Sequence, residues 1–456
     1  MDRWLKPALD YIPRWLEYQV RVMEQPGCAF AVAQNGRILL EGAFGLANIK
    51  TGAALTPRHR FRVASHSKSF TAAAVMKLRA ERRLTLDDPV GRHVRDLHPQ
   101  VAAVTLGQLL SHSAGMVRDG YDSGQWAERR PFLNEAELRA DLARGPILEA
   151  GERFKYSNHG FGLAGLAIAA VAGEPYQDYV QREIVEATGL NETRPDFPIP
   201  RGTPFARGHG AKALLGHRYV IPGENRTHAL AAATGFVSTA ADLARWFSLL
   251  HPAAKWRVLS PTTCREMIRP QWRIPHSSVE RHYGLGLDSG RLQDWTHFGH
   301  GGSFPGTLSR TVTFIEPAIT VSILTNASDG LAPFWVDGAG HILRAFARNG
   351  PPSGRNRDWA GRWAGLGGIG DWLPMGKHKV LIAAPALFNP LMDATEVEVT
   401  GRDKARIAMA NGFMNHGEAV ARLRDGRGRI AAIHFAGGKL VSEAALRREV
   451  IQRYEK

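Results

Sequence analysis

The sequence has little cysteine: Cys28 and Cys264 are the only two in 456 residues. Two thiols cannot build a disulfide framework for a chain of this length, and no Cys-x-x-Cys spacing of a zinc or redox site occurs. A single bridge between them is left open. Two buried thiols are the favoured interpretation.

Long apolar runs are also missing. The longest extends from Phe161 to Gly173, which is too short to span a bilayer and favours a buried helix. The first 25 residues intersperse charged side chains among apolar ones, as in an amphipathic helix, and lack the unbroken apolar stretch of a secretory signal. We therefore expect a cytoplasmic protein that does not interact with membranes.

No basic tract accompanies the strong positive charge. The formal net charge is +15, from 58 Lys and Arg against 43 Asp and Glu, yet the basic residues are scattered and mostly Arg. Such scatter favours a solvated surface, so we expect no nucleic-acid partner; a nucleic-acid binder remains a weaker alternative that rests on charge alone. Arg side chains could also line a cleft that accepts a carboxylate.

The remaining composition and the length indicate a soluble protein with more than one core, since hydrophobic residues make up 44% and charged residues 22%. Asn35-Gly36 predicts a hairpin turn, Ser65 opens a helical pattern, and helical signals dominate to about residue 179. Strand signals return between residues 283 and 324, followed by a helix from 334 to 347. We expect an α/β (α+β) domain at 1–348, an antiparallel sheet flanked by helices. A linker at 349–357 and a small β-barrel at 358–456 would follow.

Ser65-His66-Ser67-Lys68 is the first pattern that indicates chemistry. Residues three apart on a helix share a face, so the Lys68 amine can reach the Ser65 hydroxyl. A serine hydroxyl needs a neighbouring base before it can attack a carbonyl, and a lysine serves only if burial lowers its pKa. The alternative is an ordinary helix start with an exposed lysine.

Two further patterns follow along the chain. In Tyr156-Ser157-Asn158, the phenol could carry a proton to a leaving group, and the Asn158 amide could hold Lys68. The alternative is a loop tyrosine that precedes a helix.

The other pattern is His300-Gly301-Gly302-Ser303, where glycines beside a strand would let a substrate backbone approach closely. His300 could bond the Tyr156 phenol or a substrate carboxylate. The alternative is a glycine turn with an incidental histidine. His297 and His300 lack a third ligand nearby, so we expect no metal and no cofactor.

Together and in this order, the three patterns resemble the serine β-lactamase and penicillin-binding-protein superfamily, in particular its class C-like branch of D-aminopeptidases and esterases. The resemblance runs from about Gly27 to Phe346 and includes the segment Leu109 to Gly115, which is more a structural than a catalytic signature. The region after the linker is similar to the lipocalin-like barrel of D-aminopeptidase relatives.

The resemblance implies a role for each residue. Ser65 would be the acylated nucleophile and Lys68 its base, with Tyr156 and Asn158 in the Tyr-x-Asn positions. His300, Gly301 and Gly302 would replace a Lys-Thr-Gly element, and the backbone N–H groups of Ser65 and Ser303 would form the oxyanion hole. The catalytic set is thus Ser65, Lys68 and Tyr156, and the substrate-binding set is Asn158, His300, Gly301, Gly302 and Ser303.

His300 departs from the Lys or Arg that β-lactamases and transpeptidases normally carry at this position, and it is common in the esterase and D-aminopeptidase branch. We therefore expect a peptidase or amidase that acts on a short peptide or other small molecule. A carboxylesterase or a β-lactamase of the same superfamily is the first alternative. A non-catalytic protein that binds peptidoglycan fragments or peptides is the second, and a homo-oligomer is left open.

Overall fold

The structure, a computed structural model, describes residues 2–255, 258–275, 277–410 and 414–455. The chain forms two compact units, one of residues 25–336 and one that combines residues 1–24 with residues 337–456. Each unit has its own hydrophobic core, the first with members from Ala29 to Leu324 and the second with members from Trp359 to Ile433.

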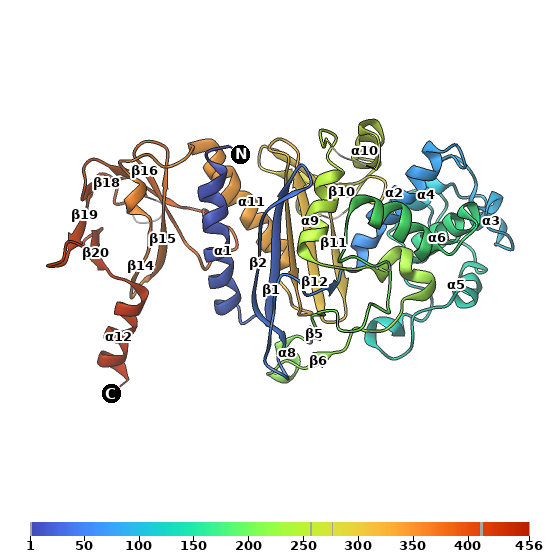
Figure 1. Ribbon diagram of the computed structural model, residues 1–456, viewed down its shortest axis with the longest axis horizontal. Helices are drawn as coiled ribbons and strands as arrows, with labels where there is room; N and C mark the ends of the chain where they lie inside the picture. Colours follow the sequence, from blue (N-terminus) through green and yellow to red (C-terminus); the bar gives the residue numbers. More distant parts are fainter. Residues whose placement is uncertain (1, 256–257, 276, 411–413, 456) are drawn as a thin grey trace. The chain divides into compact units, whose positions relative to one another are not determined.

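The unit of residues 25–336 is built on a nine-stranded antiparallel sheet in the described part of the chain (Figure 1). Asn35 and Gly36 both have positive φ angles, 52° and 74°, and turn β1 into β2 as a two-residue hairpin requires. In spatial order, the strands are β3 (Ala53–Ala54), β2 (Arg37–Asn48), β1 (Gly27–Gln34), β13 (Ile319–Thr325), β12 (Thr307–Phe314), β11 (Trp295–Phe304), β10 (Asp288–Leu292), β9 (Arg281–Tyr283) and β8 (Trp272–Arg273).

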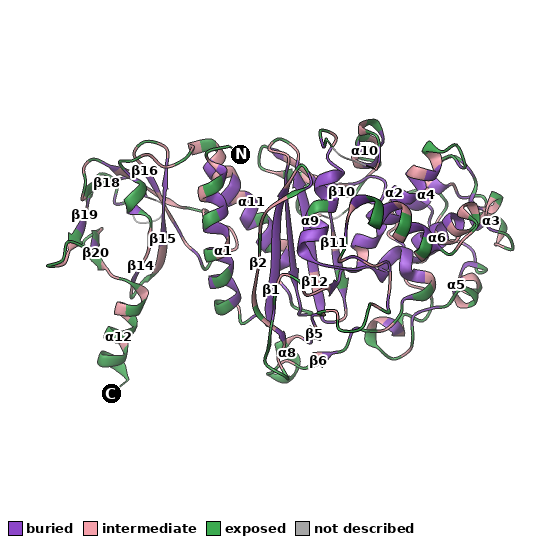
Figure 2. Ribbon diagram, in the orientation of Figure 1, coloured by how far each residue is buried: buried purple, intermediate pink, exposed green. Residues whose placement is uncertain are grey.

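Helices of the same unit pack on the sheet and on one another. Helix α9 packs on β1 and β13, and α2 and α6 pack on each other and on the π-helical turn Ala231–Gly235. Figure 2 shows β1, β11, β12 and much of α2 buried. The helices are α2 (Ser67–Ala80), α3 (Pro99–Ala102), α4 (Leu106–Leu110), α5 (Glu135–Leu142), α6 (Asn158–Ala172), α7 (Tyr176–Val180), α8 (Lys212–Leu215), α9 (Ala240–Leu249) and α10 (Pro261–Ile268).

The other unit contains a nearly closed barrel. Over the described residues its eight strands follow one another in sequence order, and a bridge between Ala364 and Val441 brings the last strand back to the first. The strands are β14 (Gly361–Gly365), β15 (Gly368–Met375), β16 (Lys379–Ala383), β17 (Thr395–Val399), β18 (Lys404–Met409), β19 (Ala419–Arg424), β20 (Ile430–Phe435) and β21 (Gly438–Leu440). Helix α12 (Glu443–Tyr454) follows, and strands β19 and β20 are more exposed than the sheet of the first unit (Figure 2).

Helix α1 (Leu5–Val22) groups with the barrel although it lies at the other end of the sequence. The Tyr11 hydroxyl donates a hydrogen bond of 3.0 Å to the buried Asp371 carboxylate on β15. The Gln19 amide, fully buried, donates to the Pro385 carbonyl at 2.6 Å. Helix α11 (Ala332–Asn349) is divided between the two units after Val336.

The structure confirms the predicted fold class, a mixed helix and antiparallel-sheet domain followed by a small barrel. It adds strands that the sequence patterns did not indicate, among them β14 and β15. Glycines at 365, 367, 368 and 370, in these strands and in the turn between them, interrupt the alternation of apolar and polar side chains. Strand β11 continues to Phe304, so His300 to Ser303 lie within a strand, which contradicts the alternative of a glycine turn there.

Two smaller expectations can be compared with the structure. Cys28 and Cys264 are both buried and are not joined by a disulfide. In the part of the chain that the structure describes, no helix has both the length and the apolar character needed to cross a bilayer.

Candidate active site

Ser65 lies in a tight turn between a short strand and a helix. Strand β4 (Phe61–Arg62) leads into a single 3-10 turn, Ala64–His66, and α2 starts directly after it. Ala64 has a φ of +45°, a conformation that costs a non-glycine residue about 1–3 kcal/mol and persists only where the surroundings enforce it. The Ser67 hydroxyl enforces it here, because it donates to the Ala64 carbonyl at 2.5 Å and accepts the Phe236 N–H at 3.0 Å.

Lys68 lies one helical turn further on and is fully buried. Its Nζ atom is 3.1 Å from Ser65 Oγ, 2.7 Å from Asn158 Oδ1 and 2.9 Å from the Ala233 carbonyl oxygen. Burial lowers the pKa of the Lys68 amine well below its usual value, and the nearby Asp119 carboxylate opposes this only in part. A neutral amine has two N–H bonds for the two carbonyl oxygens, so its lone pair remains for the Ser65 hydroxyl.

Tyr156 reaches the same hydroxyl from another segment. Its OH donates to Ser65 Oγ at 2.9 Å, and Lys68 Nζ lies 4.8 Å from the centre of its ring. Burial raises the pKa of the Tyr156 phenol above its usual value, so the group stays protonated at neutral pH and can donate a proton. The structure therefore brings together Ser65, Lys68 and Tyr156, which are distant in the sequence.

Asn158 is held by a residue that the sequence patterns did not indicate. It opens α6, which the Ser157 side chain caps by accepting the Gly160 N–H at 2.8 Å. The Asn158 Nδ2 group donates to Asp119 Oδ1 at 2.5 Å, which orients Oδ1 of Asn158 toward Lys68. Asp119 also accepts the Trp126 indole N–H at 3.0 Å. No motif marks Asp119, because its role depends on where its loop lies in space.

Strand β11 carries the pattern His300-Gly301-Gly302-Ser303, and it packs against the Ser65 turn. Gly302 sits directly over the Val63 carbonyl: a Cβ atom at Gly302 would lie 2.1 Å from that oxygen. Gly301 has more room, and Ser303 is exposed. The predicted oxyanion role of the Ser303 N–H, and the substrate contacts of Gly301 and Gly302, stay predictions.

His300 forms a hydrogen bond with the phenol of Tyr283 and not with that of Tyr156. Its Nε2 atom lies 2.9 Å from the Tyr283 hydroxyl, and its Nδ1 atom lies 2.7 Å from the Gly301 carbonyl oxygen. Burial lowers the pKa of His300 to about 4, so the ring is neutral, Nδ1 carries the proton, and Nε2 accepts from Tyr283. A neutral imidazole does not replace the positive charge of a lysine or arginine at this position.

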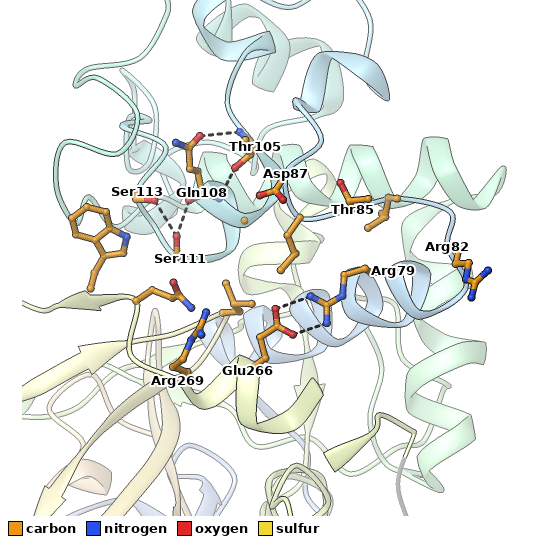
Figure 3. Close-up of a pocket in the computed structure, with 16 residues that line it drawn as sticks. Arg79, Arg82, Thr85, Asp87, Thr105, Gln108, Ser111, Ser113, Glu266 and Arg269 are labelled. Carbon is orange, nitrogen blue, oxygen red and sulfur yellow. Dashed lines mark hydrogen bonds and ion pairs between the residues drawn. The ribbon is translucent and has the colours of Figure 1, made fainter. Parts of the chain in front are cut away.

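The segment from Leu109 to Gly115 supports the tyrosine. The His112 ring lies against the Tyr156 ring, tilted by 36° with centroids 4.0 Å apart, and its Nδ1 atom accepts the Ser157 N–H at 3.1 Å. Its neighbours Ser111 and Ser113 line a separate polar cleft of about 740 Å³ between α2, α4 and α10, which Figure 3 shows together with the ion pair of Arg79 and Glu266. None of the eight predicted site residues is among the described residues that line this cleft.

No metal centre accompanies the site: among the described residues, no group of three or more His, Cys, Asp and Glu side chains could hold an ion. What the arrangement offers is a hydroxyl, a buried amine of lowered pKa and a protonated phenol in mutual contact. Such a set can transfer protons to and from a serine oxygen while that oxygen attacks a carbonyl.

The chain is similar to known proteins in sequence and in fold. The family model described as Beta-lactamase matches residues 18–340. In sequence, the chain is similar to Protein flp of Staphylococcus aureus strain N315, with 27% identity over 195 residues; the match covers 42% of this chain and only 39% of that protein.

Two known structures are similar in fold. The octameric penicillin-binding protein homologue from Pyrococcus abyssi aligns over 95% of this chain and 99% of that one, with a TM-score of 0.66 and 23% identity. A D-stereospecific amidohydrolase from Streptomyces sp. aligns over 69% of this chain and 93% of that one, with a TM-score of 0.56 and 26% identity.

Proposed function

The chain belongs to the beta-lactamase family, and from this premise we propose that it is a serine hydrolase that forms an acyl-enzyme on Ser65 and cleaves amide bonds of short peptides or amino-acid amides. The observation that carries the proposal is the convergence on Ser65 Oγ of the Lys68 amine at 3.1 Å and the Tyr156 hydroxyl at 2.9 Å.

The proposed reaction follows from the protonation states of these groups. The neutral Lys68 amine accepts the Ser65 proton while Oγ bonds to the substrate carbonyl carbon, which gives a tetrahedral oxyanion and a Lys68 ammonium. Asn158 Oδ1 and the Ala233 carbonyl stabilise this ammonium. As the carbon–nitrogen bond breaks, the leaving nitrogen takes a proton from the Tyr156 phenol, which Lys68 reprotonates. Water then attacks the acyl-enzyme by the same route and restores the Ser65 hydroxyl.

An amide substrate is favoured over a β-lactam by the neutral His300, because that side chain offers no permanent charge for the carboxylate that β-lactams carry. The similarity to a D-stereospecific amidohydrolase supports the same choice and adds a preference for D-residues. A carboxylesterase stays the alternative, since the three catalytic groups accept an alkoxide leaving group as readily as an amine.

The proposal is tested by labelling and by a substrate panel. We expect a fluorophosphonate to label the protein and Ser65→Ala to abolish the labelling. D-alanyl-p-nitroanilide, L-alanyl-p-nitroanilide, p-nitrophenyl butyrate and nitrocefin then separate the substrate classes. Turnover of the ester alone would defeat the amidase proposal, and turnover of nitrocefin alone would favour a β-lactamase. A parent protein that takes no label would instead support a silent peptide-binding protein.

The remaining expectations form part of the same proposal. We propose a cytoplasmic enzyme that needs no cofactor and has no nucleic-acid or membrane partner. Light scattering on the purified chain tests whether it forms a homo-oligomer, the state given for the Pyrococcus abyssi homologue.

A further inference from the structure

His66, the residue after Ser65, has no role in the proposed proton transfers, yet it is fully buried and bonded on both sides. Its Nδ1 atom lies 2.9 Å from the Val63 carbonyl oxygen, and its Nε2 atom lies 3.0 Å from Thr311 Oγ1 on β12. A carbonyl can only accept, so Nδ1 carries the proton and Nε2 accepts the Thr311 hydroxyl. The imidazole therefore links the Ser65 turn to the sheet.

The carbonyl that His66 holds lies at a critical contact. Val63 precedes Ala64, the residue with positive φ, and its oxygen is the atom that Gly302 of β11 covers most closely. The Ser309 hydroxyl of β12 lies 3.4 Å from His66 Nδ1 and 3.4 Å from the Gly302 carbonyl oxygen. The ring, the Val63 carbonyl and Gly302 thus fix how far β11 stands from the Ser65 turn.

That distance matters for the proposed chemistry, because β11 carries Ser303 and the turn carries Ser65, the two predicted oxyanion donors. An oxyanion hole works only when both N–H groups are about 2.7–3.1 Å from the developing negative charge. On this basis we infer that His66 is a positioning residue, which holds the Ser65 turn and β11 at the separation that acyl transfer requires.

Other roles for the ring agree less well with its surroundings. Its described hydrogen-bond partners are Val63, Thr311 and Ser309, and neither Lys68 nor Tyr156 is among them. It therefore has no direct route to the proton on Ser65. Burial, together with the nearby His300 ring, lowers the pKa of His66 to about 3, which keeps the ring neutral and its bonding pattern constant over the usual assay range.

The test compares His66→Leu, His66→Asn and a matched control, His209→Leu. Leu removes both ring nitrogens, whereas an Asn amide can still donate to the Val63 carbonyl. His209 is also fully buried; it joins the Asn326 carbonyl at 2.7 Å and the Ile49 N–H at 3.2 Å, so its loss has a similar cost for folding. Each variant is assayed for kcat, KM, fluorophosphonate labelling rate, pH profile and thermal midpoint.

For His66→Leu we expect kcat and the labelling rate to fall by about tenfold to a hundredfold, with KM changed by no more than about threefold. His66→Asn should recover most of the loss. His209→Leu should keep kcat within about twofold while losing as much thermal stability. The acidic limb of the pH profile, which reports Lys68, should stay in place in all three variants.

The inference rests on the proposed function, and the experiment separates the two. A parent protein without labelling or turnover overturns both. If the parent labels and His66→Leu labels at the parental rate, only the positioning role is lost. An acidic limb that moves in His66→Leu would show a proton-transfer role instead. A loss of kcat that merely follows the loss of folded protein, as in the His209 control, would make His66 structural only.

Discussion

At the scale of single residues, the proposed site depends on the charge balance around the Lys68 amine. Burial is the main cause of its lowered pKa, Arg118 lowers the pKa further, and Asp119 raises it by stabilising the ammonium. Asp119 also bonds the Asn158 amide that holds Lys68. The base strength of Lys68 is therefore adjusted by a carboxylate that does not touch Ser65.

Asp119→Asn is expected to move the acidic limb of the pH profile of kcat/KM to lower pH. The loss of the carboxylate destabilises the ammonium, so the pKa of Lys68 falls and the neutral, active amine persists at lower pH. Asn can still accept the Asn158 N–H, so the rate on the alkaline plateau should fall by no more than about tenfold. Glu137→Gln, a change at another half-buried carboxylate with an arginine partner, serves as control. A limb that stays in place would exclude this role for Asp119.

Residue types and spacing were sufficient to single out Ser65, Lys68 and Tyr156 as candidates, because one helical turn separates the first two. They did not reveal Asp119, the Ala233 carbonyl, or the contact of His112 with Tyr156. Every residue has a backbone carbonyl, so the residue type at Ala233 does not mark it. The Asp119 and His112 side chains lie on loops, and the sequence pattern does not show where these loops lie in space. The Tyr283 partner of His300 was missed because the two residues lie on different strands, β9 and β11, whose order in the sheet the sequence does not reveal.

At the scale of elements, the contact between β11 and the Ser65 turn is made by two adjacent glycines with opposite surroundings. A Cβ atom at Gly302 would lie 2.1 Å from the Val63 backbone oxygen, whereas one at Gly301 would find its nearest neighbour, the Ser309 carbonyl oxygen, at 3.4 Å. Neither glycine has a positive φ. Only at position 302 does the lack of space therefore require a glycine.

Gly302→Ala is expected to lower the free energy of unfolding by about 1–3 kcal/mol, because backbone must shift to make room. Gly301→Ala should be neutral or stabilising by up to about 1 kcal/mol, since alanine restricts the unfolded chain at a compatible position. Urea titration of both variants measures the difference. Equal destabilisation would mean that β11 does not approach the turn as closely as the structure has it.

The patterns indicated most of the secondary structure of the first unit but left open whether His300 to Ser303 form a turn or belong to strand β11. Three glycines at 299, 301 and 302 interrupt the apolar alternation, and a turn is the usual meaning of such a run. In the structure they permit close backbone contact within a strand, because the neighbouring turn needs the space. The same ambiguity concealed β14 and β15.

At the scale of the whole molecule, a set of neutral histidines links stability to pH: His66 and His300 are buried and His297 is half-buried. Burial lowers the pKa of His66 to about 3 and the pKa values of His297 and His300 to about 4. In the unfolded chain each histidine titrates near 6.5. Between that value and the folded pKa, only the unfolded state takes up the proton, so stability decreases as the pH falls.

We therefore expect the thermal midpoint to drop steadily between about pH 7 and about pH 5, with each such histidine contributing up to about 1.4 kcal/mol per pH unit. His297→Asn should make the decline shallower, since one of the protons no longer binds on unfolding. Calorimetry at three pH values measures both proteins. A midpoint that is independent of pH in this window would mean that the rings are accessible to protons in the folded state.

The division of the chain into units also concerns the whole molecule. The domain boundaries expected from the sequence, at residues 348 and 358, stay a prediction. The sequence does not indicate that α1 groups with the barrel. Amphipathic helices show that one face is buried but not which partner buries it. Trp15 is fully buried and donates to the Leu387 carbonyl at 3.3 Å, so both ends of the sequence contribute to one compact unit.

This arrangement predicts the behaviour of a chain cut in the expected linker. With a specific protease site inserted after the exposed Gly354, the cut leaves α1 on one fragment and the barrel on the other. The contacts of Tyr11, Trp15 and Gln19 should keep the fragments together on size exclusion. Trp15→Ala removes a buried indole, at a cost of about 3–5 kcal/mol, and should release the barrel fragment. Lys6→Ala, an exposed position on the same helix, should not. If the parental fragments separate as readily as those of Trp15→Ala, α1 does not hold the barrel.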